Sequence, residues 1–66
     1  MEHNIRLNWQ SFVKAAVKRR KQQGLTQVQL SLLVEVSKPT LVSFEKGETK
    51  ISLGNAIKIL KILGLD

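Results

Sequence analysis

Several closely spaced polar side chains in this sequence are hydrogen-bond donors, which suit binding rather than catalysis. Gln27 and Gln29 are two residues apart, and Lys38, Thr40 and Ser43 follow within one short segment. Amide, ammonium and hydroxyl groups can donate to phosphate oxygens and to the edges of nucleic-acid bases. The chain has one histidine, no cysteine and five scattered acidic residues, which offer no paired carboxylates or ligand cluster. We therefore expect a binding protein rather than an enzyme, with no metal site and no cofactor.

Length and charge support the same expectation. The chain has 66 residues, enough for one small domain, and its 42% of apolar residues favour a globular fold. Eleven Lys and Arg residues against five Asp and Glu residues give a net charge of +6. Such an excess of positive charge on a small body favours nucleic acid as a partner. The absence of cysteine and of a secretory signal at the start predicts a cytoplasmic protein, and the short apolar runs predict no membrane span.

Two helices joined by a tight turn form the centre of the predicted fold. Thr26 and Ser37 are typical helix-capping residues, and each is followed by apolar residues at helical spacing. The first helix is expected over about residues 27–34, and the second begins directly after Ser37. Because only Glu35 and Val36 lie between the first helix and the Ser37 cap of the second, the helices must cross steeply. This arrangement is the helix-turn-helix, whose second helix projects into a groove of DNA.

The outer face of this second helix is the predicted base-reading surface, and we expect no long acidic side chain in its way. Lys38 is expected to donate to guanine O6 and N7, and Ser43 to several bases. Pro39 or Thr40 offers an apolar surface to a thymine methyl group. An ordinary solvated helix face has similar residues, so the pairing of the two helices carries more weight than the residue types.

Four further residues are predicted to contact phosphates. Gln27 and Gln29 lie in the first turn of the first motif helix, where free backbone N–H groups and the positive end of the helix dipole attract an anion. Lys46 and Lys50 flank the base-reading surface. Contacts from these residues would fix the position of the protein on DNA without reading its sequence.

A helix is expected before the motif, over about residues 8–23, with an N-terminal arm over residues 1–8. Arg20 falls on the apolar stripe of this helix, and a buried charge without a partner costs several kcal/mol, so we expect an ion pair with Glu45. The basic run of residues 18–21 is interpreted mainly as complementing the dipole of its own helix. A nucleic-acid patch or a targeting signal is the alternative interpretation of this run.

A last helix is expected from the Ser52 cap to about Leu63. The residues predicted to close the core from this helix are Leu53, Ala56, Ile57, Leu60 and Leu63, and Leu33 of the first motif helix is expected to widen the same core. A second apolar strip is predicted on another face, covered by a second copy of the chain rather than by the arm. The candidate dimer or partner surface comprises Leu32, Ile59, Ile62 and Leu65.

The ordered succession of these residues resembles the Cro/repressor-type helix-turn-helix domain of phage repressors and bacterial xenobiotic-response-element-like regulators. The matching positions are 24–27, Leu30, Val34, 36–37, 40–41, 44–47, 52–53 and 59–65. The resemblance implies a compact, all-α, lambda-repressor-like DNA-binding domain of four to five helices, which we assign to residues 9–66. It also implies a bacterial or phage-encoded, nucleoid-associated protein that binds a palindromic operator in double-stranded DNA as a homodimer.

The resemblance further implies roles for individual residues. The positions that match DNA-contacting residues of the family are Lys38, Pro39 and Ser43 for bases and Gln27 and Lys46 for the backbone. Gln27 is also expected to support the second motif helix, and Arg20 and Glu45 match a buried ion pair of the phage repressors. The sequence departs from the family at Glu35, where glycine is usual, and at Pro39, where a long polar side chain is frequent, so DNA shape gains weight in the expected readout.

Two functions are consistent with these observations. The first is a sequence-specific transcriptional regulator, a repressor that excludes polymerase by occupying its site. The second is an antitoxin that binds a protein toxin through its extra apolar surface and represses its own operon. Enrichment of one palindrome from random duplexes favours the first function, and co-purification with the product of a neighbouring gene favours the second.

Overall fold

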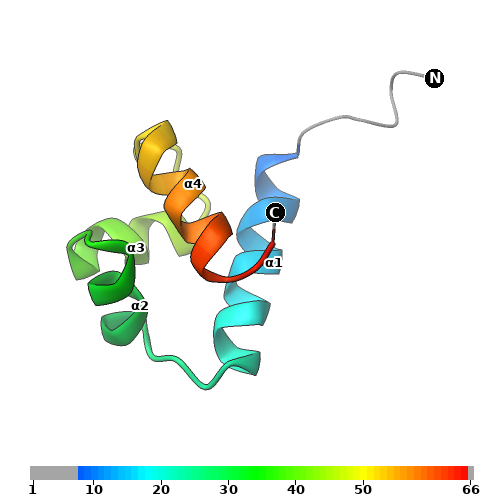
Figure 1. Ribbon diagram of the computed structural model, residues 1–66. Coiled ribbons are helices and arrows are strands. Elements are labelled where there is room, and N and C mark those ends of the chain that lie inside the picture. Colours follow the sequence, from blue (N-terminus) through cyan, green and yellow to red (C-terminus); the bar gives the residue numbers. More distant parts are fainter. Residues whose placement is uncertain (1–7, 66) are drawn as a thin grey trace.

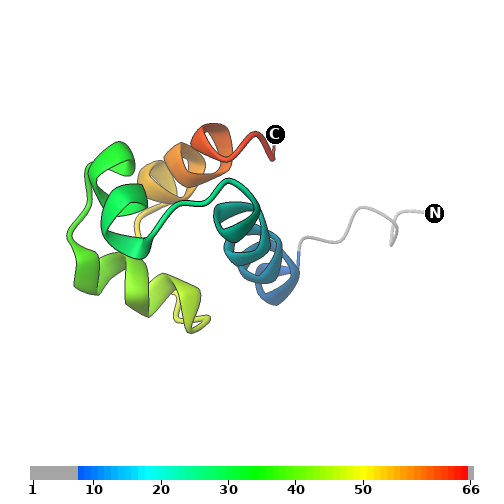
Figure 2. The same cartoon turned by 90° about the horizontal axis from the view of Figure 1, so that it is seen from below.

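The computed structural model describes residues 8–65, and this part of the chain folds into four helices without a strand (Figure 1). The helices are α1 (Trp9–Gln22), α2 (Gln27–Val34), α3 (Lys38–Glu45) and α4 (Leu53–Ile62). The shorter helices α2 and α3 lie on one side of the molecule and α1 on the other, as Figures 1 and 2 show from two directions. The all-α fold expected from the sequence is confirmed.

Each helix begins at a side chain that caps its first turn. The caps are Asn8, Thr26, Ser37 and Ser52, and each side-chain oxygen accepts the backbone N–H of the residue three positions further on. A cap of this kind stabilises a helix by about 1 kcal/mol, because it satisfies a donor that has no partner within the helix. The caps set the starts of the helices where the sequence predicted them, while α1 and α4 each end one residue earlier than expected.

All four helices contribute to one apolar core. Its buried residues are Val13 and Ala16 of α1, Leu30 and Val34 of α2, Leu41 and Phe44 of α3, Ile59 of α4 and Leu63 directly after it. Trp9 and Phe12 pack edge-to-face against Phe44, with ring centroids 5.6 and 5.5 Å away from that of Phe44. These aromatic contacts join the start of α1 to the end of α3.

The face of α4 that enters the core differs from the predicted one. Ile59 is fully buried, so it cannot belong to the exposed strip to which it was assigned. Leu53 and Ile57 are 76% and 43% exposed, so they do not close the core as expected. Both faces of α4 carry apolar residues, and the position of α4 against α2 selects the stripe of Ala56 and Ile59 for burial.

The exposed apolar residues of α2 also correct the sequence prediction. Leu33 is 52% exposed and therefore does not widen the core. Leu30 and Val34, one helical turn apart, already fill the inward face of this short helix. Leu32 is 72% exposed, as a residue of the candidate partner surface must be.

The two ends of the chain bear on two further expectations. Of the arm predicted over residues 1–8, residues 1–7 lie outside the described residues, and Asn8 is the N-cap of α1. Near the other end, Ile62 is 41% exposed, whereas Leu65 is half-buried against the core.

Within residues 8–65 no helix combines the length and the apolar character needed to cross a membrane.

Candidate nucleic-acid interface

The turn between α2 and α3 is made by one residue in a left-handed conformation. Glu35 has φ 66° and ψ 43°, and its backbone N–H donates to the carbonyl of Ser31. The N–H of Val36 donates to the same carbonyl at 3.0 Å. This closure ends α2 abruptly and sends the chain into α3 after three residues, which gives the steep crossing of a helix-turn-helix. A left-handed glutamate costs roughly 1 kcal/mol or more relative to glycine.

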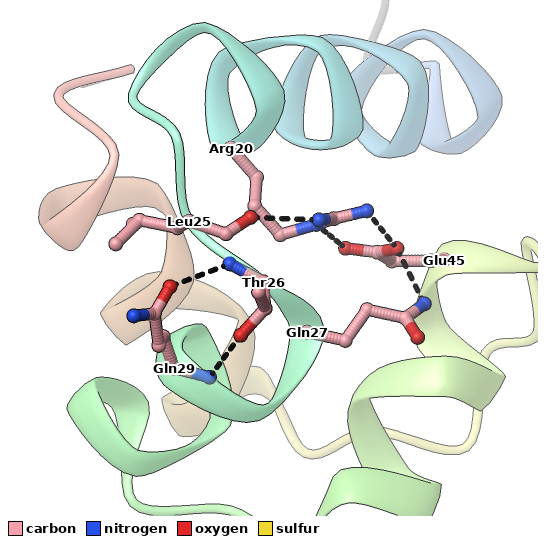
Figure 3. A network of polar contacts seen from close by, with 6 residues as sticks. All are labelled: Arg20, Leu25, Thr26, Gln27, Gln29 and Glu45. Carbon is pink, nitrogen blue, oxygen red and sulfur yellow. Dashed lines mark hydrogen bonds and ion pairs between the residues drawn. The ribbon is translucent and has the colours of Figure 1, made fainter.

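A buried polar network fixes the end of α3 against α1 and α2 (Figure 3). Arg20 Nε donates to Glu45 Oε2 at 2.7 Å, and Arg20 Nη2 donates to Glu45 Oε1 at 3.1 Å. Gln27 Nε2 donates to the same Oε1 at 2.9 Å, and Arg20 Nη1 donates to the carbonyl of Leu25 at 2.9 Å. The structure thus brings Arg20 and Glu45 together in a two-pronged ion pair. The contact with Gln27 ties the start of α2 to the end of α3.

The start of α2 is organised by a reciprocal cap. Gln29 N donates to Thr26 Oγ1 at 3.0 Å, while Thr26 N donates to Gln29 Oε1 at 2.8 Å. The side-chain amide N–H groups of Gln29 remain available to an anion, and so do the backbone N–H groups of Gln27 and Val28, which have no acceptor within the helix. Both predicted phosphate contacts therefore lie at this helix terminus, where Gln27 is half-buried and Gln29 is exposed.

Lys38 and Pro39 are the most accessible of the predicted base-reading residues. Both are exposed in the first turn of α3, directly after the Ser37 cap. Thr40 is half-buried, and its hydroxyl shares a hydrogen bond of 2.8 Å with that of Ser37. The hydroxyl of Thr40 is therefore held toward the cap.

Ser43 is not a free donor, which corrects the expectation that no acidic side chain approaches this face. Its hydroxyl donates to the carboxylate of Glu48, and Lys50 Nζ lies 3.6 Å from the same carboxylate oxygen. The hydrogen bond from Ser43 lowers the pKa of Glu48, and the positive charge of Lys50 lowers it further. The sequence reasoning missed Glu48 because the loop after α3 folds back, with Glu48 N donating to the carbonyl of Ser43 at 3.2 Å.

A hollow of about 220 Å³ joins the base-reading residues to the following loop. It is lined by Pro39, Thr40, Ser43, Lys50 and Ile51. The structure therefore places Lys50, a predicted phosphate contact, beside three of the four predicted base-reading residues. Lys46 is exposed at the C-cap of α3.

A second, apolar groove of about 430 Å³ lies between α1 and α4. Its lining residues are Asn8, Trp9 and Phe12 from the start of α1 and Leu53, Ala56, Ile57 and Leu60 from α4. Of the surface predicted for a dimer or partner, only Leu32 and Ile62 are exposed, to 72% and 41%. The structure contradicts this prediction at Ile59, which is fully buried, and the exposed residues of α4 in the groove are instead Leu53 and Ile57.

Comparison with known proteins agrees with this geometry. Residues 18–66 match the family model described as "Helix-turn-helix". Over 63 residues the chain is 35% identical to a protein of Haemophilus influenzae named "Uncharacterized HTH-type transcriptional regulator". That alignment covers 96% of this chain and 61% of the relative, so the chain spans less than two thirds of the relative's length. The chain therefore belongs to the Cro/repressor-type, xenobiotic-response-element-like helix-turn-helix family.

Proposed function

We propose that this protein is a sequence-specific DNA-binding transcriptional regulator that acts as a repressor in the cytoplasm. The main support is the exposed first turn of α3, which presents Lys38 and Pro39 while the ion pair of Arg20 and Glu45 fixes the other end of the helix. A helix anchored in this way can enter the major groove with its N-terminal residues against base edges. A repressor of this kind occupies its operator and excludes polymerase.

The proposed base contacts follow from the groups that remain free. Lys38 donates to guanine O6 and N7, and the ring of Pro39 packs against a thymine methyl group. Because the Ser43 hydroxyl donates to Glu48, its oxygen is left to accept from an amino group of adenine or cytosine. The methyl group of Thr40 offers a second apolar contact, since its hydroxyl is shared with Ser37.

The proposed phosphate contacts frame this surface on two sides. Gln27 and Gln29 hold one phosphate at the start of α2, where the amide donors and the helix dipole act together. Lys46 and Lys50 hold the DNA backbone on the other side, near the loop after α3. These contacts give affinity without specificity, so the affinity falls steeply as salt increases.

Selection of bound sequences from a random duplex library tests the function. We expect one enriched sequence made of two inverted half-sites about one helical turn apart, as two copies of α3 require. Lys38→Ala is expected to relax the preference at one base pair, with a loss of about 1–3 kcal/mol for the preferred base. The control is Lys61→Ala, an exposed lysine of α4 outside the proposed interface. Selection that enriches no common sequence would refute sequence-specific binding.

Repression is tested separately with a reporter gene placed behind the selected sequence. We expect expression to fall when the protein is produced and to recover with Lys38→Ala. Unchanged or increased expression in the presence of wild-type protein would contradict the repressor role and leave the DNA-binding proposal intact.

We further propose that two copies of the chain assemble through the groove between α1 and α4. The groove is almost entirely apolar, and the 76% exposure of Leu53 at its edge is costly for an isolated molecule. Neither Lys38 nor Pro39 lines this groove, so a two-fold contact there leaves both base-reading surfaces accessible. A toxin bound in the groove, as expected of an antitoxin, is the competing occupant.

A further inference from the structure

The basic run at the end of α1 divides into two pairs with different surroundings. Arg19 Nη1 donates to the carbonyl of Leu63 at 2.9 Å, so this side chain caps the end of α4 rather than complementing α1 alone. Arg20 is buried against Glu45. Lys18 and Lys21, in contrast, are exposed. The two arginines thus stabilise the fold, and the two lysines remain to be explained.

Lys18 and Lys21 belong to a longer cationic stripe along α1, which also includes Lys14. The three lysines are spaced four and three residues apart, so they lie on one face of the helix. Together with Val13, Val17 and Glu45 they line a shallow hollow of about 450 Å³. We refer to Lys14, Lys18 and Lys21 as the lysine stripe.

The charge of the lysine stripe is not balanced within the described fold. Other lysines have acidic neighbours: Lys50 pairs with Glu48, and Lys58 lies 3.7 Å from a carboxylate oxygen of Glu35. Within residues 8–65 no carboxylate forms an ion pair with a residue of the stripe. Glu45 shares the hollow, but Arg20 and Gln27 occupy both of its oxygens. Like charges one turn apart on a helix repel each other, so an external anion would stabilise this face.

The lysine stripe adjoins the proposed phosphate site at the start of α2. Glu45 is the common neighbour, since it lines the hollow of the stripe and also accepts the amide of Gln27 (Figure 3). Gln27 is the first residue of α2, where one phosphate is proposed to bind. A strand of DNA held at Gln27 therefore has the stripe next to it.

We propose that the lysine stripe binds further phosphates of the DNA strand that Gln27 contacts, and so extends the DNA footprint beyond the half-site. The inference rests on the proposed DNA-binding function. Lysine ammonium groups act on phosphates as point charges, so this contact adds affinity without reading bases. The contact is detected by counting the counterions that are released when DNA binds. Each neutralised phosphate contributes about 0.9 to the magnitude of the slope of log K against log salt concentration.

A pair of charge-matched double variants tests the proposal. Lys18→Gln with Lys21→Gln removes two positive charges from the stripe, and Lys58→Gln with Lys61→Gln removes two from α4 as the control. We expect the stripe variant to lower the salt slope by about 1.8, through two lost phosphate contacts, and to weaken binding equally for operator and non-specific DNA. The control is expected to keep the wild-type slope. Phosphate ethylation interference should detect contacts flanking the half-site that the stripe variant lacks.

The outcomes separate this inference from the function on which it rests. Wild-type protein that binds no DNA overturns both. Wild-type protein that binds its operator, with equal slopes for the stripe and control variants, overturns the lysine stripe alone. If either double variant fails to fold by circular dichroism, the single variants Lys21→Gln and Lys61→Gln give the same comparison, with an expected difference of about 0.9 in slope.

Discussion

Glu45 accepts three hydrogen bonds from two side chains of different helices, which makes it the residue on which the position of α3 most depends. The side chains of Arg20 and Glu45 are only 10% and 8% exposed. Removing one partner of a buried ion pair is costly, because the charge that remains has neither a partner nor water around it. The same carboxylate orients Gln27, so the ion pair influences the proposed phosphate site as well as the fold.

Glu45→Ala is therefore expected to lower the free energy of unfolding by about 3–5 kcal/mol, measured by urea denaturation. Replacing the pair together, by Arg20→Met with Glu45→Leu, should recover most of this loss, since no charge is then left buried. If Glu45→Ala lowers the free energy of unfolding by less than about 1 kcal/mol, the ion pair is not buried, because exposed ion pairs contribute stability in that range.

Glu48 gives a prediction about protonation. Its pKa is lowered chiefly by the hydrogen bond from Ser43, so Ser43→Ala is expected to raise the pKa of Glu48 in an NMR titration. A lowered pKa in the folded state means that the carboxylate stabilises the fold above the unfolded-state pKa. This contribution is lost as pH falls through the lower, folded-state value. Lys50→Gln should also raise this pKa, and an unchanged pKa in Ser43→Ala would exclude the hydrogen bond as the main cause.

At the scale of elements, the turn between α2 and α3 stores strain in one residue. Glu35 has a left-handed backbone, and within residues 8–65 its side chain forms only an exposed ion pair with Lys58. Glu35→Gly is expected to be more stable than Glu35→Ala by about 1 kcal/mol in thermal or urea unfolding, because glycine adopts this conformation without a clash. Both variants lose the ion pair, so their difference isolates the backbone. Equal stabilities would show that the turn is not strained.

The starts of the helices were predictable from the sequence because the signal is local. Thr26, Ser37 and Ser52 cap their own helices through residues three positions away, so no knowledge of the fold is needed. The Arg20–Glu45 pairing was also accessible, since a charge on an apolar stripe requires a partner and few acidic residues are available. The candidate site on α3 follows from the same local signals.

Other features depend on contacts between elements and were not predictable in this way. Both faces of α4 carry apolar residues, so only packing against α2 decides that Ile59 is buried and Leu53 exposed. The contact of Ser43 with Glu48 requires the loop after α3 to fold back on the helix. The capping role of Arg19 toward Leu63 joins positions 44 residues apart. Periodicity within one segment carries no information about such contacts.

At the scale of the whole molecule, the proposed contact between copies in the groove between α1 and α4 can be tested without disturbing the core. Leu53→Ser with Ile57→Ser changes two exposed residues of this groove, so the free energy of unfolding of the monomer should change little. We expect the double variant to weaken self-association in sedimentation equilibrium. The control is Leu33→Ser, an exposed leucine of α2 outside both the groove and the predicted partner surface.

The same experiment decides between the occupants of the groove. Self-association that persists in the double variant would exclude the groove as the interface between copies. A wild-type monomer that binds its operator and forms a stable complex with a toxin, sensitive to the same two substitutions, would instead support the antitoxin function.

The contact of Trp9 with the end of α3 gives the protein an optical reporter of its own. Trp9 is the only tryptophan of the chain, its ring packs against Phe44, and its indole N–H donates to the carbonyl of Gly47 at 3.2 Å. Gly47 lies between Lys46 and Lys50, two of the proposed phosphate contacts. Fluorescence emission from this single indole can therefore follow rearrangement of the loop during titration with a duplex, without any attached dye.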